Sequence, residues 1–145
     1  MQKITLAKTA GLCFGVNRAV NLLEKMVENG EKACTLGPII HNPQVISHFE
    51  NHGVRVIDRP DDCHANETLV VRTHGVEKAV LSAVEESGRP FLNATCPFVT
   101  KIHKIVRENS TPENVTFIAG DSRHPEVVGI RSYCNGRSFV FNSYE

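Results

Sequence analysis

Short apolar segments of strand length alternate with amphipathic segments of helix length along almost the whole chain. Most strand candidates are followed by a turn or loop, and the helix candidates repeat apolar residues every three or four positions. Because a helix is the usual connection between parallel strands, this order predicts an α/β fold of βαβ units with mainly parallel sheets. The predicted strands are 3–8, 32–37, 54–57, 68–75, 90–94, 114–120 and 137–142.

The composition excludes several classes of protein. Apolar residues make up 41% of the chain and charged residues 22%, which is typical of a globular domain rather than a disordered tail. Sixteen Lys and Arg balance sixteen Asp and Glu, so charge gives no support for a nucleic-acid partner or a membrane-surface role. No apolar run approaches the roughly 20 residues of a membrane helix, and the first residues do not resemble a signal peptide. We therefore expect a cytoplasmic protein.

Five cysteines limit the kind of metal site that this chain can form. The number is odd and no C-x-x-C pair occurs, which excludes the local spacings of zinc ribbons and bacterial ferredoxins. Any metal site must therefore combine distant segments. Buried packing is the expected role of Cys34, Cys63 and Cys134, because free cysteine is a small apolar residue.

Cys13 and Cys96 stand at predicted helix starts. Pro97 follows Cys96 directly, and proline suits the first position of a helix; Cys13 lies in a glycine-containing turn before another helix. A helix N-terminus favours thiolate, the form of cysteine that binds metal. The spacing alone leaves a metal ligand and a packing residue as equal alternatives at both positions.

Three histidines and a glutamate also follow predicted strands, at His41, His74, His124 and Glu126. In a parallel sheet all such connections emerge at one edge, so these side chains are expected to converge there. Imidazoles beside helix N-termini suit a phosphate or diphosphate, and they equally suit zinc with a bound water. Glu126 is either a general acid or a first-turn carboxylate that stabilises its helix. The other histidines are expected at the surface: His48, His52, His64 and His103.

Five segments in order resemble the amino-terminal portion of the 4-hydroxy-3-methylbut-2-enyl diphosphate reductases, the IspH/LytB family. This family of iron-sulfur enzymes ends the non-mevalonate isoprenoid pathway. The segments are GLCFGVNRA (11–19), GPIIHNPQV (37–45), RTHGV (72–76), NATCPFVTKIHK (93–104) and RHPEVVG (123–129).

The resemblance implies a three-lobed α/β enzyme that encloses a 4Fe-4S cluster, with three cysteine ligands and one iron open to substrate. Cys13 and Cys96 match the first two ligands. The resemblance further implies two-electron reductive dehydroxylation of the substrate to isopentenyl and dimethylallyl diphosphate, with electrons from a ferredoxin- or flavodoxin-like donor. His41, His74 and His124 match the diphosphate-binding histidines, and Glu126 matches the proton donor.

The third cysteine ligand of the family has no counterpart here, so the resemblance implies a fragment with little capacity to hold a cluster alone. Its expected parts are a first α/β lobe over 1–96 and an incomplete second lobe over 97–145, with strand 3–8 pairing with a third lobe. Two alternatives stay open: a zinc-dependent hydrolase built on the three histidines with Glu126 as base, and an inactive phosphate-binding fragment.

Overall fold

The protein is described by a computed structural model that covers residues 3–8 and 10–143. Helices and parallel strands alternate in it, so the predicted α/β fold is confirmed. The elements are α1 (Phe14–Glu28), β1 (Ala33–Leu36), α2 (Pro43–Asn51), β2 (Arg55–Ile57), the 3-10 helix η1 (Pro60–Asp62), β3 (Thr68–Val71), α3 (Lys78–Glu86), β4 (Phe91–Asn93), α4 (Pro97–Asn109), β5 (Val115–Ala119), α5 (Pro125–Ser132) and β6 (Arg137–Phe141).

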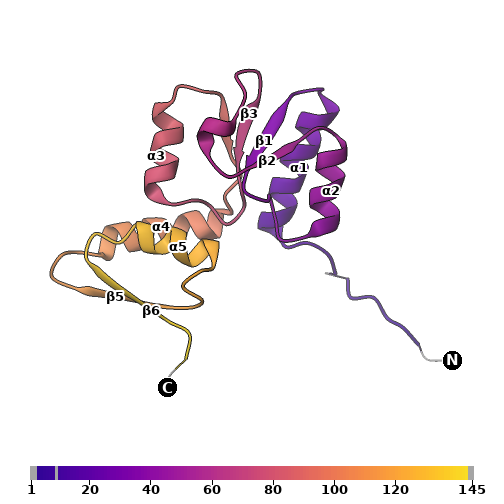
Figure 1. Ribbon diagram of the computed structural model, residues 1–145. Helices are drawn as coiled ribbons and strands as arrows, with labels where there is room; N and C mark the ends of the chain where they lie inside the picture. Colours follow the sequence, from indigo (N-terminus) through magenta and orange to yellow (C-terminus); the bar gives the residue numbers. More distant parts are fainter. Residues whose placement is uncertain (1–2, 9, 144–145) are drawn as a thin grey trace.

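Two parallel sheets organise the chain (Figure 1). The larger one has the strand order β2-β1-β3-β4, and the smaller one pairs β5 with β6. Helices α1 and α2 lie on one side of the larger sheet and α3 on the other, whereas α4 and α5 lie between the two sheets (Figure 1). Because every strand of the larger sheet points the same way, the connections that follow β1, β3 and β4 meet at one edge.

The central strands of the larger sheet, β1 and β3, are buried on both faces, as strands of parallel sheets usually are. Ala33 and Val70 belong to the core that α1 and α2 cover, together with Leu23 and Phe49. The alternate residues of the same strands belong to the core under α3; these are Cys34, Leu36, Leu69 and Val71. Strands β1 and β3 therefore each contribute side chains to both cores.

Residues 3–8 do not form the predicted strand. They are irregular, and Ile4 and Leu6 are 94% and 82% exposed. A strand needs a neighbouring strand to accept its backbone hydrogen bonds, and 10–143 provide none beside this segment, which runs away from the folded body in Figure 1. The apolar alternation of KITLAK is therefore not sufficient for a strand here.

The predicted surface position of His103 is also wrong. His103 is 6% exposed, and its ring stacks on that of Tyr133 at a centroid distance of 4.3 Å and an interplanar angle of 17°. His103 follows Val99 by four residues, so both lie on the inward face of α4, whereas the apolar Ile102 is 37% exposed. The helical register, and not side-chain polarity, decides which residue of this helix is buried.

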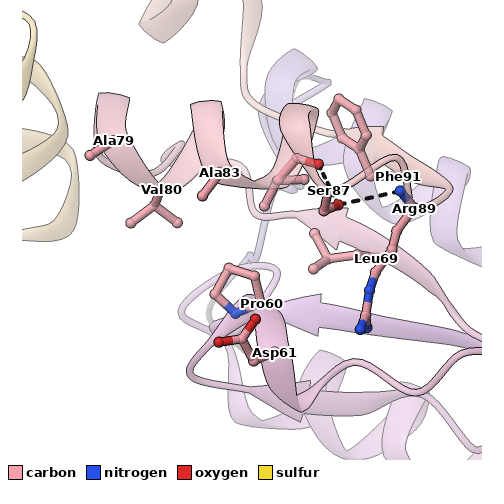
Figure 2. Close-up of a pocket in the computed structure, with 10 residues that line it drawn as sticks. Pro60, Asp61, Leu69, Ala79, Val80, Ala83, Ser87, Arg89 and Phe91 are labelled. Carbon is pink, nitrogen blue, oxygen red and sulfur yellow. Dashed lines mark hydrogen bonds between the residues drawn. The ribbon is translucent and has the colours of Figure 1, made fainter.

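An apolar pocket of about 290 Å³ lies between α3, η1 and the sheet, lined by Val80, Leu69 and Phe91 among others (Figure 2). It contains none of the cysteines, histidines or the glutamate that the sequence marks as functional. Separately, no helix in the described ranges combines the length and hydropathy that a membrane span requires.

Gly37 opens the connection from β1 to α2 with φ +72°, a backbone conformation that side chains disfavour. A Cβ atom there would collide with the guanidinium of the half-buried Arg72, whose Nε donates to the carbonyl of Gly75 at 3.2 Å. The close approach of Arg72 therefore needs glycine at this position.

We predict that Gly37→Ala lowers the free energy of unfolding more than Gly88→Ala does. Gly88 has φ +65° but nothing within 4 Å of its Cβ position, so its replacement costs only backbone strain, about 1–2 kcal/mol. Displacement of Arg72 should add about 1 kcal/mol or more. Urea denaturation of both variants measures the difference, and equal losses would contradict the role of Arg72.

Candidate functional site

Three predicted site histidines come together at the carboxyl edge of the larger sheet. His41 follows β1, His74 follows β3, and His124 is the N-cap residue of α5. The ring centroids of His41 and His74 are 4.7 Å apart, and His124 lies 6.0 Å and 5.5 Å from them. One ring nitrogen from each can be chosen so that all three lie within 4.8 Å of one another. The structure thus brings together side chains that are far apart in the sequence.

Thr73 connects the loops that carry these residues. Its hydroxyl donates to the carbonyl of Ile39 at 2.7 Å, and its backbone N–H donates to the same oxygen at 3.3 Å. Its own carbonyl accepts the N–H of Cys96 at 2.9 Å. Thr73 is 2% exposed, so these bonds are shielded from water. They fix His41, His74 and Cys96 relative to one another through their backbones.

Capping hydrogen bonds at the starts of α2 and α5 orient His41 and His124. The side-chain oxygen of Asn42 accepts the N–H groups of Gln44 at 3.0 Å and Val45 at 3.3 Å, which fixes the turn that follows His41. The Nδ1 atom of His124 accepts the N–H of Glu126 at 3.2 Å. An accepting Nδ1 carries no proton, so neutral His124 has its proton on Nε2. This leaves an N–H donor for a ligand and holds Glu126 in the first turn of α5.

His74 is neutral at physiological pH. Burial, the largest cause, and repulsion from His41, His124 and Arg72 together lower its pKa to about 4. Its buried Nδ1 has no hydrogen-bond partner within 3–8 or 10–143. An unpaired buried nitrogen beside two other imidazoles is typical of a site for a ligand or an ion.

The two predicted ligand cysteines lie at the same edge of the sheet. Cys13 is the exposed N-cap residue of α1, Cys96 is the half-buried N-cap residue of α4, and neither side chain caps its helix by a hydrogen bond. The Sγ atom of Cys96 lies against Gly15, two residues after Cys13, where any Cβ would collide with it. Both thiols are therefore free at the positive ends of neighbouring helices.

Arg18 holds these two helix starts together. Its guanidinium donates to the carbonyls of Thr95 at 3.4 Å and Asn93 at 3.5 Å, in the turn that precedes Cys96. The arrangement fits two cysteine ligands of an iron-sulfur cluster, because neither side chain is used as a helix cap and Gly15 leaves space beside Cys96. The other cysteines lie elsewhere in the fold, at Cys34 in β1, Cys63 after η1 and Cys134 after α5.

Sequence reasoning missed the three residues that fix this geometry: Thr73, Gly15 and Arg18. A polar residue two positions after a buried strand was the available signal for Thr73. Gly15 within an otherwise apolar helix face was the signal for a close approach. Nothing in the local pattern around Arg18 indicates its bonds, since its acceptors lie 75 and 77 residues further along the chain.

Comparison with known proteins gives the family. The model of the family described as LytB protein matches residues 4–145. The chain belongs to the LytB family. Curated LytB relatives carry the name 4-hydroxy-3-methylbut-2-enyl diphosphate reductase. That of Thermoanaerobacter sp. (strain X514) is 41% identical over 147 residues, and that of Clostridioides difficile (strain 630) is 34% identical over 143 residues.

The chain spans about half the length of the curated relatives it matches: the two alignments cover 99% and 98% of this chain but 51% of each relative. A solved structure titled as (E)-4-hydroxy-3-methyl-but-2-enyl diphosphate reductase, the terminal enzyme of the non-mevalonate pathway, is 36% identical with a TM-score of 0.77. It is covered to 51%, and this chain to 97%. A Plasmodium falciparum structure, 22% identical with a TM-score of 0.82, shares the fold.

We predict that His74 makes folding stability depend on pH. Its folded pKa of about 4 lies below its ordinary 6.5, so the unfolded chain binds more protons between these values. The contribution is complete above pH 6.5 and is lost as the pH falls toward 4, and it amounts to about 3 kcal/mol. Denaturant unfolding across this range should show a flatter pH dependence for His74→Gln, with His52→Gln as the exposed control. Identical curves for wild type and His74→Gln would contradict the prediction.

Proposed function

We propose that this chain forms part of a 4-hydroxy-3-methylbut-2-enyl diphosphate reductase and provides its diphosphate-binding histidines, two cluster ligands and a proton donor. The observation that carries the proposal is the convergence of His41, His74 and His124 beside the helix start that bears Glu126. The zinc-dependent hydrolase would use the same histidines, but the relatives that match this chain are named reductases, which favours the reductase.

The three histidines would bind the diphosphate of the substrate. His124 offers Nε2–H, and the N-termini of α2 and α5 add the positive ends of their dipoles. His74, neutral when the site is empty, would bind a proton more readily once an anion lies beside it. A His74 ring that gains its charge only with the ligand would add attraction for the diphosphate without a charge in the empty site.

Glu126 would deliver the proton that the leaving hydroxyl group requires. Its backbone N–H donates to Nδ1 of His124, so its side chain lies in the same turn as one of the histidines that would bind the diphosphate. A carboxyl group there would lie within reach of a substrate whose diphosphate is bound by the histidines. In this role Glu126 transfers a proton and does not contribute to affinity.

Cys13 and Cys96 would hold a 4Fe-4S cluster together with a third thiolate from outside this chain. When bound, the cluster supplies two electrons and a Lewis-acidic iron for the allylic oxygen. A ferredoxin- or flavodoxin-like protein would supply those electrons, and the enzyme would work in the cytoplasm. The structural contribution of this chain is a pair of thiols at the N-termini of α1 and α4, two helix starts that Arg18 and Gly15 hold together.

We also propose a division into lobes at Cys96, with a first lobe over 1–96 and part of a second over 97–145. The four-stranded sheet lies in the first range and the β5-β6 pair in the second. Contacts between α3 and α5 support a close association of the two, including the bond from the N–H of Lys78 to the hydroxyl of Ser132 at 2.8 Å. The site histidines would then come from both lobes.

Inorganic pyrophosphate tests the anion site on the chain itself. We expect calorimetry at neutral pH to show binding that weakens at least about tenfold in His124→Ala, because one ligand hydrogen bond is worth about 1.4 kcal/mol or more. His52→Ala, at the exposed end of α2, is the matched control and should bind as wild type does. Unaltered affinity of His124→Ala for pyrophosphate would contradict the proposal that the three histidines bind the diphosphate.

The proton-donor role requires a chain continued to the length of the relatives. We expect Glu126→Gln in that protein to lower turnover by about 100-fold or more and to leave pyrophosphate affinity unchanged, because only proton delivery is removed. Turnover is measured with 4-hydroxy-3-methylbut-2-enyl diphosphate and a low-potential reductant. Wild-type turnover in Glu126→Gln would refute this role. If the continued wild-type chain bound pyrophosphate but was inactive, the phosphate-binding alternative would hold instead.

A further inference from the structure

A second cluster of metal-ligating side chains lies in the core under α3. The Sγ atoms of Cys34 and Cys63 and a carboxylate oxygen of Glu67 all lie within 4.8 Å of one another. Cys34, Cys63 and Glu67 are 0%, 3% and 8% exposed. Neither Cys13, Cys96 nor the histidine cluster belongs to this group.

The fold presents these ligands from two adjacent segments. Cys34 lies within β1, with Arg55 and Leu69 as its register neighbours in β2 and β3. Cys63 ends η1, and Glu67 directly precedes β3. The side chain of Arg89 runs past Leu69 (Figure 2) and donates to the carbonyl of Cys63, which holds the 63–67 loop against the sheet.

Charge balance at this cluster favours a divalent cation. Glu67 forms an ion pair with the guanidinium of Arg55, which donates two hydrogen bonds to its carboxylate. The two bonds are bidentate, with Nε–Oε1 at 2.8 Å and Nη2–Oε2 at 2.7 Å. Carboxylate oxygens keep further lone pairs for a metal while they accept from arginine. Two thiolates and Glu67 would carry three negative charges, and a divalent ion with Arg55 carries three positive charges.

We propose that Cys34, Cys63, Glu67 and His64 form a zinc-binding site in this protein. Nδ1 of His64 lies 3.6 Å from Oε1 of Glu67, and this imidazole is mostly exposed, so it is free to turn toward the ion. Thiolate, imidazole and carboxylate are the usual zinc ligands, and four of them complete a tetrahedral structural site. On binding, the two thiols release one proton each to the solvent as the two Zn–S bonds form.

A route to the site exists from the surface. A cavity of about 410 Å³ has His52, His64, Asn66 and Glu67 among its lining residues. It gives an ion access to the carboxylate and imidazole before the deeper thiols are reached. Without metal the thiol of Cys63 makes only weak contacts with backbone oxygens: its Sγ lies 3.6 Å and 3.8 Å from the carbonyls of His64 and Glu67.

Cobalt(II) added to the chain, freed of metal and kept reduced, tests the site. We expect a thiolate-to-cobalt charge-transfer absorption that saturates at one ion per chain and is abolished by one equivalent of zinc. The histidine cluster cannot give this absorption, because it contains no thiolate. The absorption should persist in a Cys13→Ser, Cys96→Ser double variant and in Cys134→Ser, the matched control for a cysteine outside the cluster.

Two variants locate the ligands. Cys63→Ser should abolish the charge-transfer absorption or shift it to lower intensity, and His64→Ala should weaken zinc binding at least tenfold. His64 is mostly exposed, so its replacement keeps the test valid if Cys63→Ser does not fold. The absence of a charge-transfer band in wild type, its loss in the Cys13→Ser, Cys96→Ser variant, or wild-type zinc affinity in His64→Ala would each overturn the proposal. All these outcomes are independent of the reductase function.

Discussion

One buried threonine determines how the loops at the carboxyl edge of the sheet are placed. Thr73 donates two hydrogen bonds to the carbonyl of Ile39 and accepts the N–H of Cys96. One set of hydrogen bonds therefore joins the loops that follow β1, β3 and β4, which are neighbours in the sheet. Buried backbone groups without partners cost about 1–3 kcal/mol each, so these loops have little freedom to separate. The histidines and Cys96 are positioned by backbone bonds, and their side chains remain available for ligands.

Two ionisable groups, His74 and Glu67, are stabilised in opposite charge states: His74 is neutral and Glu67 is charged. At the edge of the sheet, burial and mutual repulsion keep His74 uncharged, and its Nδ1 is unpaired in the described structure. In the core under α3, Glu67 keeps its charge because Arg55 pairs with both of its oxygens. The unpaired nitrogen of His74 can form a hydrogen bond with a ligand. The ion pair with Arg55 fixes the carboxylate of Glu67 beside two thiols. Both follow from which neighbours the parallel sheet places beside each group.

Much of this fold and of the histidine cluster could be predicted from the sequence, and the exceptions have physical causes. Strand and helix periods depend on local spacing, and parallel strands send their loops to one edge, so the convergence of His41, His74 and His124 was predictable. The burial of His103 was missed because polarity was given more weight than its place four residues after Val99. Residues 3–8 do not form the predicted strand because no neighbouring strand is available to them in the described structure. The proximity of Cys34 to Cys63 depends on a loop conformation, which a periodic sequence pattern cannot predict.

The histidine cluster joins segments that are distant along the chain: 74 − 41 = 33 and 124 − 74 = 50 positions separate its members. Contacts of such high sequence separation require the loss of chain entropy in the long intervening segments. The cluster therefore exists only while the whole arrangement of strands and the contact with α5 persists. Amide exchange at Cys96, whose proton is bonded to Thr73, would report the same opening that disperses the imidazoles.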